Sequence, residues 1–106
     1  MIPEISAREL ADRLRGPNPP RLIDVREPNE WAFCRIAGAE LKPMSAIMAW
    51  MPELDRTTEL VIQCHSGVRS WQVAQYLQAH GFQRVFNLRG GIDAWSVDVD
   101  PTVPRY

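Results

Sequence analysis

The run Leu60-Val61-Ile62-Gln63 is the feature that most constrains how this chain can fold. It leads directly into Cys64, and a segment with helical spacing of apolar residues follows from Ser70 to His80. A short apolar run without alternation is typical of a strand that is buried on both faces, as in a parallel sheet. The sequence therefore predicts a strand, a tight loop that carries a thiol, and a helix, in that order.

The same alternation of strands and helices recurs along the chain, which is the pattern of a parallel sheet covered on both faces. All 106 residues are expected to form one domain, residues 1–106. The tail from Asp98 to Tyr106 is expected to run irregularly over the surface. The expected helices are Ser6–Leu14, Pro28–Phe33, Met44–Met51, Ser70–His80 and Ile92–Trp95, and the expected strands are Arg21–Val25, Leu60–Gln63 and Arg84–Leu88, with a short one near Ala37–Leu41.

Composition excludes several classes of function. A net charge of −1 leaves no strongly basic face for nucleic acid, and no apolar stretch is long enough to span a membrane. The two cysteines, Cys34 and Cys64, have no spacing typical of a zinc site, so neither a metal nor a cofactor is expected. With no signal peptide visible, we expect a reducing, cytoplasmic compartment and free thiols.

Three segments should meet at one edge of the sheet, because sites in parallel α/β sheets form beyond the carboxyl ends of the strands. These segments are Asp24-Val25-Arg26, Cys64 through Arg69, and Asn87 through Gly91. The Cys64 loop lies just before a helix, where unpaired backbone N–H groups favour anions and a thiolate. The sequence thus predicts a nucleophile site for an anionic or sulfur-bearing substrate.

A thiol nucleophile needs ionisation, access and a place for the charge of the leaving group, and this loop offers all three. Gly67 permits a left-handed backbone, so successive N–H groups can curl around an anion. Arg69 can hold an oxyanion through two parallel hydrogen bonds. The predicted site has Cys64 as nucleophile, with His65, Ser66, Gly67, Val68, Arg69 and Ser70 binding the substrate anion.

The number of residues in the loop distinguishes sulfur transfer from phosphate chemistry. Four residues lie between Cys64 and Arg69, whereas a phosphate-binding loop of the tyrosine-phosphatase kind has five. A shorter loop makes a smaller ring of N–H groups, which suits a single transferable sulfur better than a tetrahedral phosphate. A phosphatase also needs an acid for its leaving group, and no carboxylate of the sequence stands out for that role.

Three motifs in order resemble the rhodanese-like family in its single-domain form. They are Leu22-Ile23-Asp24-Val25-Arg26-Glu27-Pro28-Asn29-Glu30-Trp31, the loop Cys64-His65-Ser66-Gly67-Val68-Arg69-Ser70, and Asn87-Leu88-Arg89-Gly90-Gly91-Ile92-Asp93-Ala94-Trp95. The resemblance spans residues 5–106. One turn departs from the family pattern, since Cys34-Arg35-Ile36-Ala37-Gly38-Ala39 stands where Gly-His-Ile-Pro-Gly-Ala is usual.

The resemblance implies an α/β fold of three layers, α/β/α, with a mainly parallel central sheet of about five strands. It also implies that Cys64 carries a sulfane sulfur as a persulfide and passes it to cyanide, a small thiol or a protein thiol such as thioredoxin. Asp24 and Arg26 would brace the site. The loop favours thiosulfate or a persulfidated small thiol as the donor over mercaptopyruvate.

Two other functions stay open on the sequence. One is a phosphatase or arsenate reductase built on the same scaffold, and the other is a rhodanese-like binding module without catalysis. Cys34 is either a passive substitution or a resolving thiol that attacks a persulfide on Cys64. The oligomeric state is not predicted.

Overall fold

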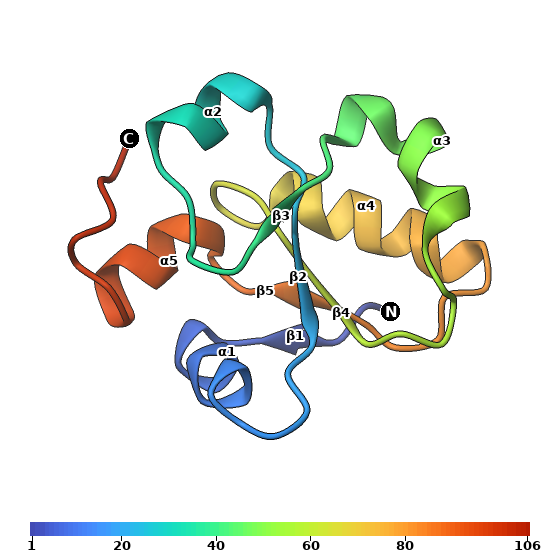
Figure 1. The fold of residues 1–106 in the computed structure, drawn as a ribbon, viewed down its shortest axis with the longest axis horizontal. Helices are drawn as coiled ribbons and strands as arrows, with labels where there is room; N and C mark the ends of the chain where they lie inside the picture. The colour runs from blue at the N-terminus through green and yellow to red at the C-terminus, as the bar shows by residue number, and fades with distance from the viewer.

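Five parallel strands form one central sheet in the computed structural model, which describes residues 1–106 (Figure 1). The strand order is β1-β5-β4-β2-β3, and every neighbouring pair is parallel. The strands are β1 (Glu4–Ile5), β2 (Arg21–Asp24), β3 (Glu40–Leu41), β4 (Leu60–Gln63) and β5 (Val85–Leu88). The predicted fold class, a mainly parallel sheet of about five strands between helices, is confirmed.

Helices cover both faces of the sheet. The helices are α1 (Ala7–Leu14), α2 (Pro28–Phe33), α3 (Ile47–Trp50), α4 (Val68–Ala79) and α5 (Gly91–Asp98), with two 3-10 turns, η1 (Met44–Ala46) and η2 (Met51–Glu53). In Figure 1, α1 and α5 lie on one side of the strands, and α3 and α4 lie on the other. This arrangement gives the three layers that the resemblance implied.

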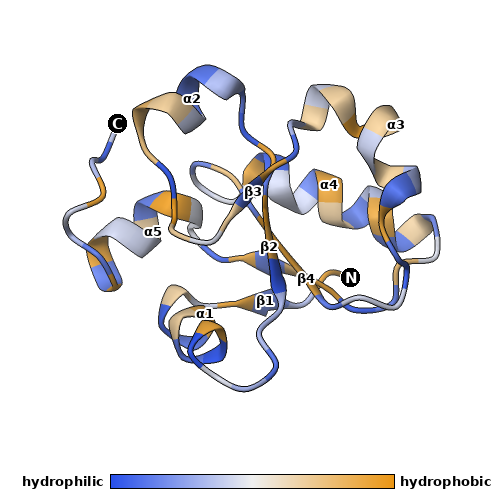
Figure 2. Cartoon of the chain, in the orientation of Figure 1, coloured by the Kyte–Doolittle hydropathy of each residue, from blue (hydrophilic) through white to orange (hydrophobic).

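Alternate residues of the strands feed two separate cores, because successive side chains of a strand point to opposite faces. Figure 2 shows the hydrophobic character of the central strands. The α4-side core includes Ile23, Val25, Trp50, Leu60, Ile62, Cys64, Val73, Ala74, Leu77 and Val85. The α1-side core includes Leu10, Leu22, Cys34, Ile36, Val61, Leu88, Ile92, Trp95 and Val103.

The predicted capping box at the start of α1 is confirmed. The Ser6 hydroxyl accepts from the Glu9 N–H at 3.1 Å, and the Glu9 carboxylate accepts from the Ser6 N–H at 3.1 Å. The unusual turn before β3 also closes, since the Ala39 N–H donates to the Ile36 carbonyl and Gly38 has a φ of +87°. The glycine retained in this turn is enough to form it without the usual proline.

Four expectations about the elements need correction. The helix expected over Met44–Met51 is divided into η1, α3 and η2, because the backbone leaves the helical conformation at Ala46, whose φ and ψ are −109° and +19°. Helix α4 starts two residues earlier than expected, and α5 runs on to Asp98. Strand β1 was missed, because two residues are too few to produce a pattern.

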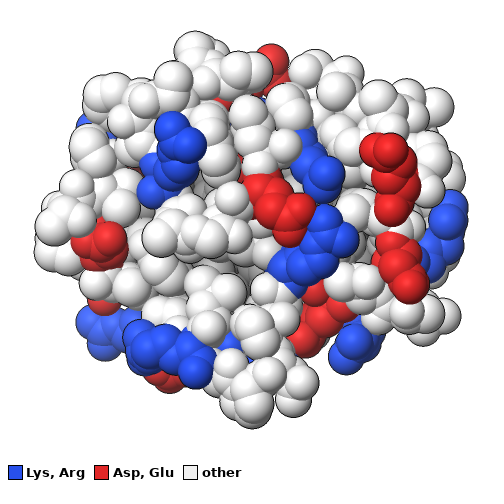
Figure 3. All heavy atoms as spheres, viewed as in Figure 1, with Lys and Arg blue, Asp and Glu red and all other residues white.

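Charges of both signs are interspersed on the face drawn in Figure 3. No helix of the chain combines the length and the apolar character needed to cross a bilayer.

Candidate functional site

Cys64 lies directly after β4, at the carboxyl edge of the sheet. The backbone turns back at Gly67, whose φ is +109°, and α4 starts at the next residue. The Gly67 N–H donates to Cys64 Sγ at 3.1 Å, and the Ser70 hydroxyl lies 3.3 Å from the same sulfur. The loop therefore curls around the sulfur as the glycine in the sequence predicted, with one amide and one hydroxyl directed at it.

The expected access to the sulfur is wrong for this conformation. Cys64 is only 1% exposed and belongs to the α4-side core. Among the other loop residues, Ser66 and Val68 are exposed, and His65 is partly buried. Reagents therefore meet the rim of the loop before they can meet the sulfur.

The first turn of helix α5 supports the Cys64 loop through two backbone hydrogen bonds. The Ile92 N–H donates to the Cys64 carbonyl at 2.9 Å, and the Asp93 N–H donates to the His65 carbonyl at 3.1 Å. A Cβ on Gly91 would lie 2.5 Å from both of these carbonyl oxygens, which only glycine can avoid. The third sequence motif therefore packs against the Cys64 loop and fixes its backbone.

Asn87, at the end region of β5, ties the same loop to the sheet. Its Nδ2 donates to the Gly67 carbonyl at 3.1 Å and to Glu4 Oε2 at 3.0 Å, and its Oδ1 accepts from the Ser70 hydroxyl at 2.6 Å. Asn87 is 1% exposed. This side chain positions Ser70, the residue whose hydroxyl reaches Cys64.

The guanidinium of Arg69 is not free to bind a substrate anion. Its Nη1 and Nη2 donate to Glu30 Oε1 and Oε2 at 2.8 and 2.9 Å. These hydrogen bonds lower the pKa of Glu30 to about 2 and raise the pKa of Arg69. Arg69 was predicted to bind an oxyanion of the substrate. In this conformation its two donors are instead occupied by the Glu30 carboxylate.

Tyr106 packs on this ion pair. Its hydroxyl donates to Glu30 Oε2 at 2.7 Å, and its ring stacks on His65 with centroids 4.1 Å apart. Burial of the phenol raises the pKa of Tyr106 to about 12. After Asp98 the tail has no helix or strand and is mostly exposed, as expected. Its end lies beside α2 (Figure 1), where the Tyr106 ring meets His65 of the Cys64 loop.

Asp24 and Arg26 form a fully buried ion pair at the end of β2. Arg26 Nη2 and Nε contact the Asp24 carboxylate at 2.7 to 3.1 Å, and both side chains are 0% exposed. Arg26 also donates to the Cys34 carbonyl at 2.7 Å and to the Tyr106 hydroxyl at 2.9 Å. The pair connects β2 with the segment after α2 and with the tail, which is a bracing arrangement.

The two cysteines are both free, buried thiols. Cys34 belongs to the α1-side core and Cys64 to the α4-side core, on opposite faces of the sheet. This separation favours the passive role for Cys34, because a resolving thiol must approach to disulfide distance.

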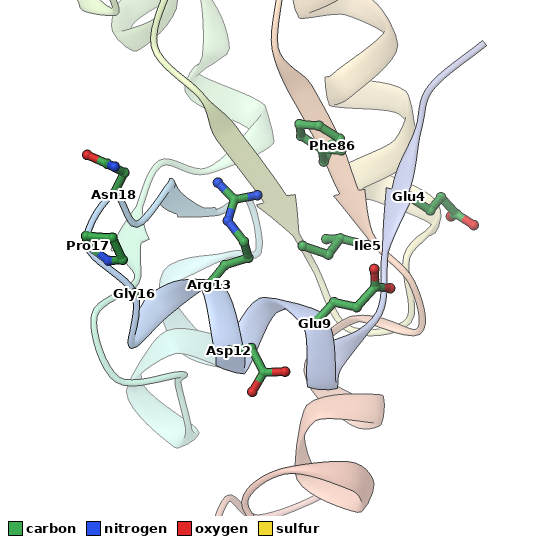
Figure 4. A pocket seen from close by; sticks show the side chains of 9 residues that line it. All are labelled: Glu4, Ile5, Glu9, Asp12, Arg13, Gly16, Pro17, Asn18 and Phe86. Atoms are coloured by element: carbon green, nitrogen blue, oxygen red, sulfur yellow. The ribbon is translucent and has the colours of Figure 1, made fainter.

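No cluster of three or more His, Cys, Asp or Glu side chains is arranged to hold a metal ion. Figure 4 shows a pocket of about 650 Å³ between α1 and the β1 edge of the sheet, and none of its lining residues belongs to the Cys64 loop.

Sequence reasoning gave no role in this site to Glu30 or Tyr106, and it placed Asn87 at this edge of the sheet without assigning it a role. Asn87 and Glu30 stand inside motifs that the resemblance identified, so their position in those motifs was a usable signal. Tyr106 gave no signal, because it follows two prolines in a segment without periodicity.

Comparisons with known proteins agree with this geometry. A family profile described as "Rhodanese-like domain" matches residues 6–98. The chain is 42% identical over 96 residues to a "Sulfurtransferase" of Allochromatium vinosum, an alignment covering 91% of this chain and 90% of that protein. It is 37% identical to "Rhodanese-like/PpiC domain-containing protein 12, chloroplastic" of Arabidopsis thaliana, of which it spans 38% while 99% of this chain is covered.

Solved structures share the fold. A "Rhodanese-like Domain Protein from Staphylococcus aureus" superposes with a TM-score of 0.85 at 31% identity, covering 99% of each chain. A protein of Rhodopseudomonas palustris described as a "Possible Tyrosine Phosphatase" has a TM-score of 0.78 at 22% identity, covering 99% of this chain and 85% of that one, which shows the fold alone. By its family profile, its relatives and its fold, this chain belongs to the rhodanese-like family, among relatives described as sulfurtransferases.

Proposed function

We propose that this chain is a sulfurtransferase that moves a sulfane sulfur from thiosulfate or a persulfide donor, through a persulfide on Cys64, to a thiol or cyanide. One observation carries the proposal: the Gly67 N–H and the Ser70 hydroxyl converge on Cys64 Sγ at 3.1 and 3.3 Å. Hydrogen-bond donors held around a sulfur stabilise negative charge there. A thiolate and a persulfide anion both have such charge.

In the first step the Cys64 thiolate attacks the outer sulfur of thiosulfate. The new S–S bond forms as the S–S bond of thiosulfate breaks, and the electron pair leaves with sulfite. In the second step an acceptor thiolate takes the outer sulfur of the Cys64 persulfide, and Cys64 leaves as a thiolate. Both steps conserve charge and need no cofactor.

The 1% exposure of Cys64 sets a condition on the first step. The donor reaches the sulfur only after groups at the rim of the loop move aside. His65 and Arg69 are two of the loop residues beside the sulfur. His65 is held by the ring of Tyr106 in the tail, and Arg69 is held by Glu30 of α2. In the conformation that the structure describes, the sulfur is therefore covered.

Mass spectrometry of the intact protein after incubation with thiosulfate tests the proposal. We expect a gain of one sulfur in the wild type and in Cys34→Ser, and no gain in Cys64→Ser. A sulfur that is still gained in Cys64→Ser would contradict the assignment of the nucleophile. Turnover of an aryl phosphate or of arsenate without any sulfur gain would instead favour the phosphatase or arsenate reductase alternative.

The acceptor is tested separately with the persulfidated protein. Cyanide, a small thiol and reduced thioredoxin are each expected to remove the added sulfur, since each offers a nucleophile to the outer sulfur atom. A persulfide that no nucleophile removes would favour a binding module without catalysis.

A further inference from the structure

We propose that Glu30 is a specificity-determining residue of this sulfur-transfer reaction, because its carboxylate holds the Arg69 fork that an anionic donor would otherwise take. The inference rests on the proposed function and deepens it by naming the class of donor. With the fork occupied, donors that have little negative charge are favoured over the thiosulfate dianion.

The contact between the two side chains is bidentate. Arg69 Nη1 and Nη2 each meet one oxygen of Glu30, at 2.8 and 2.9 Å. This is the geometry in which a guanidinium binds carboxylates, and it is the same pair of donors that a sulfonate would use. A donor can therefore gain these two hydrogen bonds only by displacing Glu30.

The charges at the rim lead to the same conclusion. The Arg69 hydrogen bonds lower the pKa of Glu30 to about 2, so the carboxylate remains charged at neutral pH. The pair as a whole has no net charge. An approaching dianion thus meets a carboxylate beside the arginine, and the repulsion grows with the charge of the donor.

Glu30 is fixed by contacts other than Arg69. The Glu27 N–H donates to Oε1 at 3.0 Å, and the Tyr106 hydroxyl donates to Oε2 at 2.7 Å. Tyr106 in turn accepts from the buried Arg26 at 2.9 Å. These contacts hold the carboxylate in place, so displacing it means breaking two further hydrogen bonds besides the ion pair with Arg69.

The test compares two sulfane donors of different charge, thiosulfate as the dianion and methanethiosulfonate as the monoanion. The variant is Glu30→Gln, which keeps the shape and one acceptor oxygen but removes the charge. We expect the ratio of kcat/KM for thiosulfate to kcat/KM for methanethiosulfonate to rise roughly tenfold at low ionic strength. The rise should shrink as salt is added.

Glu40→Gln is the matched control. Glu40 also accepts two hydrogen bonds from an arginine, from Arg21 Nε and Nη2 at 2.9 and 2.7 Å, but Arg21 is the first residue of β2 and not part of the Cys64 loop. This variant loses the same charge and the same kind of pair, and the donor ratio should not change. An equal rise in both variants would show a general charge effect and overturn the proposal.

Tyr106→Phe supplies an independent check. The ring stack on His65 is kept, while the hydroxyl that donates to Glu30 is lost. The donor ratio should move in the same direction as in Glu30→Gln, by a smaller factor. A donor ratio that stays at the wild-type value in Glu30→Gln would overturn the assignment of Glu30, whatever Tyr106→Phe shows.

Binding without turnover separates failure of the inference from failure of the proposed function. Calorimetry would measure thiosulfate binding to Cys64→Ser and to Cys64→Ser combined with Glu30→Gln. The second protein should bind about tenfold more tightly. Tighter binding with no sulfur gain in the wild type would reject the sulfur-transfer function alone, and equal binding would reject the role of Glu30.

Discussion

The Oγ atom of Ser70 lies 2.6 Å from the Oδ1 atom of Asn87, and both side chains are buried. The Asn87 amide nitrogen is already committed to Gly67 and Glu4, so its oxygen faces Ser70 as an acceptor. Ser70 has a single hydroxyl proton. That proton can be donated either to Asn87 Oδ1 or to Cys64 Sγ, which lies 3.3 Å from the Ser70 oxygen, and donation to the sulfur stabilises negative charge there.

Ser70→Ala should therefore slow sulfur loading of Cys64. Removing one preorganised donor from a developing anion lowers rates by on the order of 10². Rapid-quench mass spectrometry after mixing with thiosulfate measures the rate. Ser45→Ala, an exposed serine on the 3-10 turn after β3, should load like the wild type, and equal rates in both variants would remove Ser70 from the mechanism.

Asp24→Asn should destabilise the protein strongly. It leaves Arg26 fully buried without its counter-charge, and breaking such a pair costs about 3–5 kcal/mol. Asp12→Asn removes the carboxylate of an exposed pair with Arg15 and should change stability by less than about 0.5 kcal/mol. Urea unfolding followed by tryptophan fluorescence gives both values, and similar values would mean that Arg26 finds another partner.

Gly91→Ala should cost more stability than Gly38→Ala. Both glycines have positive φ values, +59° for Gly91 and +87° for Gly38. At each position the backbone conformation of an alanine should lower the free energy of unfolding by about 1–2 kcal/mol. Only at Gly91 would the new Cβ meet the Cys64 and His65 carbonyl oxygens, at 2.5 Å, which adds about 1–3 kcal/mol. Thermal unfolding measures the difference, and Gly91→Ala should also load sulfur more slowly.

The pairing of Glu30 with Arg69 should appear in the pH dependence of stability. The pKa of Glu30 falls from 4.5 to about 2 on folding, so its contribution is present above pH 4.5 and is lost as the pH falls toward 2. The gap in unfolding free energy between the wild type and Glu30→Gln should therefore shrink between pH 6 and pH 2.5. We expect a change on the order of 1–2 kcal/mol, because the Arg69 side chain is 32% exposed and solvent screens the pair.

Local patterns were sufficient to predict the unit built from β4, the Cys64 loop and α4. An apolar run, a glycine that permits a left-handed backbone and a helical repeat are all encoded in the continuous segment from Leu60 to Ala79. The parallel sheet followed from repetition of that unit. The placement of Cys64 at the carboxyl edge was thus accessible from the sequence.

Contacts between distant residues were not accessible in this way. Tyr106 meets Glu30 across 76 positions of the chain, and no periodicity reports such a pairing. Arg69, whose guanidinium was predicted from the loop alone to be free for a substrate anion, pairs with Glu30 across 39 positions. The burial of Cys64 likewise depends on packing around the loop, which spacing along the chain does not encode.

The strands at the two ends of the sheet, β1 and β3, are only two residues long each. An outermost strand exposes unpaired N–H and C=O groups along its outer side, and these can recruit an extended segment of another molecule. Because each edge strand is so short, a segment of another molecule could form only a few backbone hydrogen bonds with it. The architecture should accordingly resist edge-to-edge aggregation even at high protein concentration.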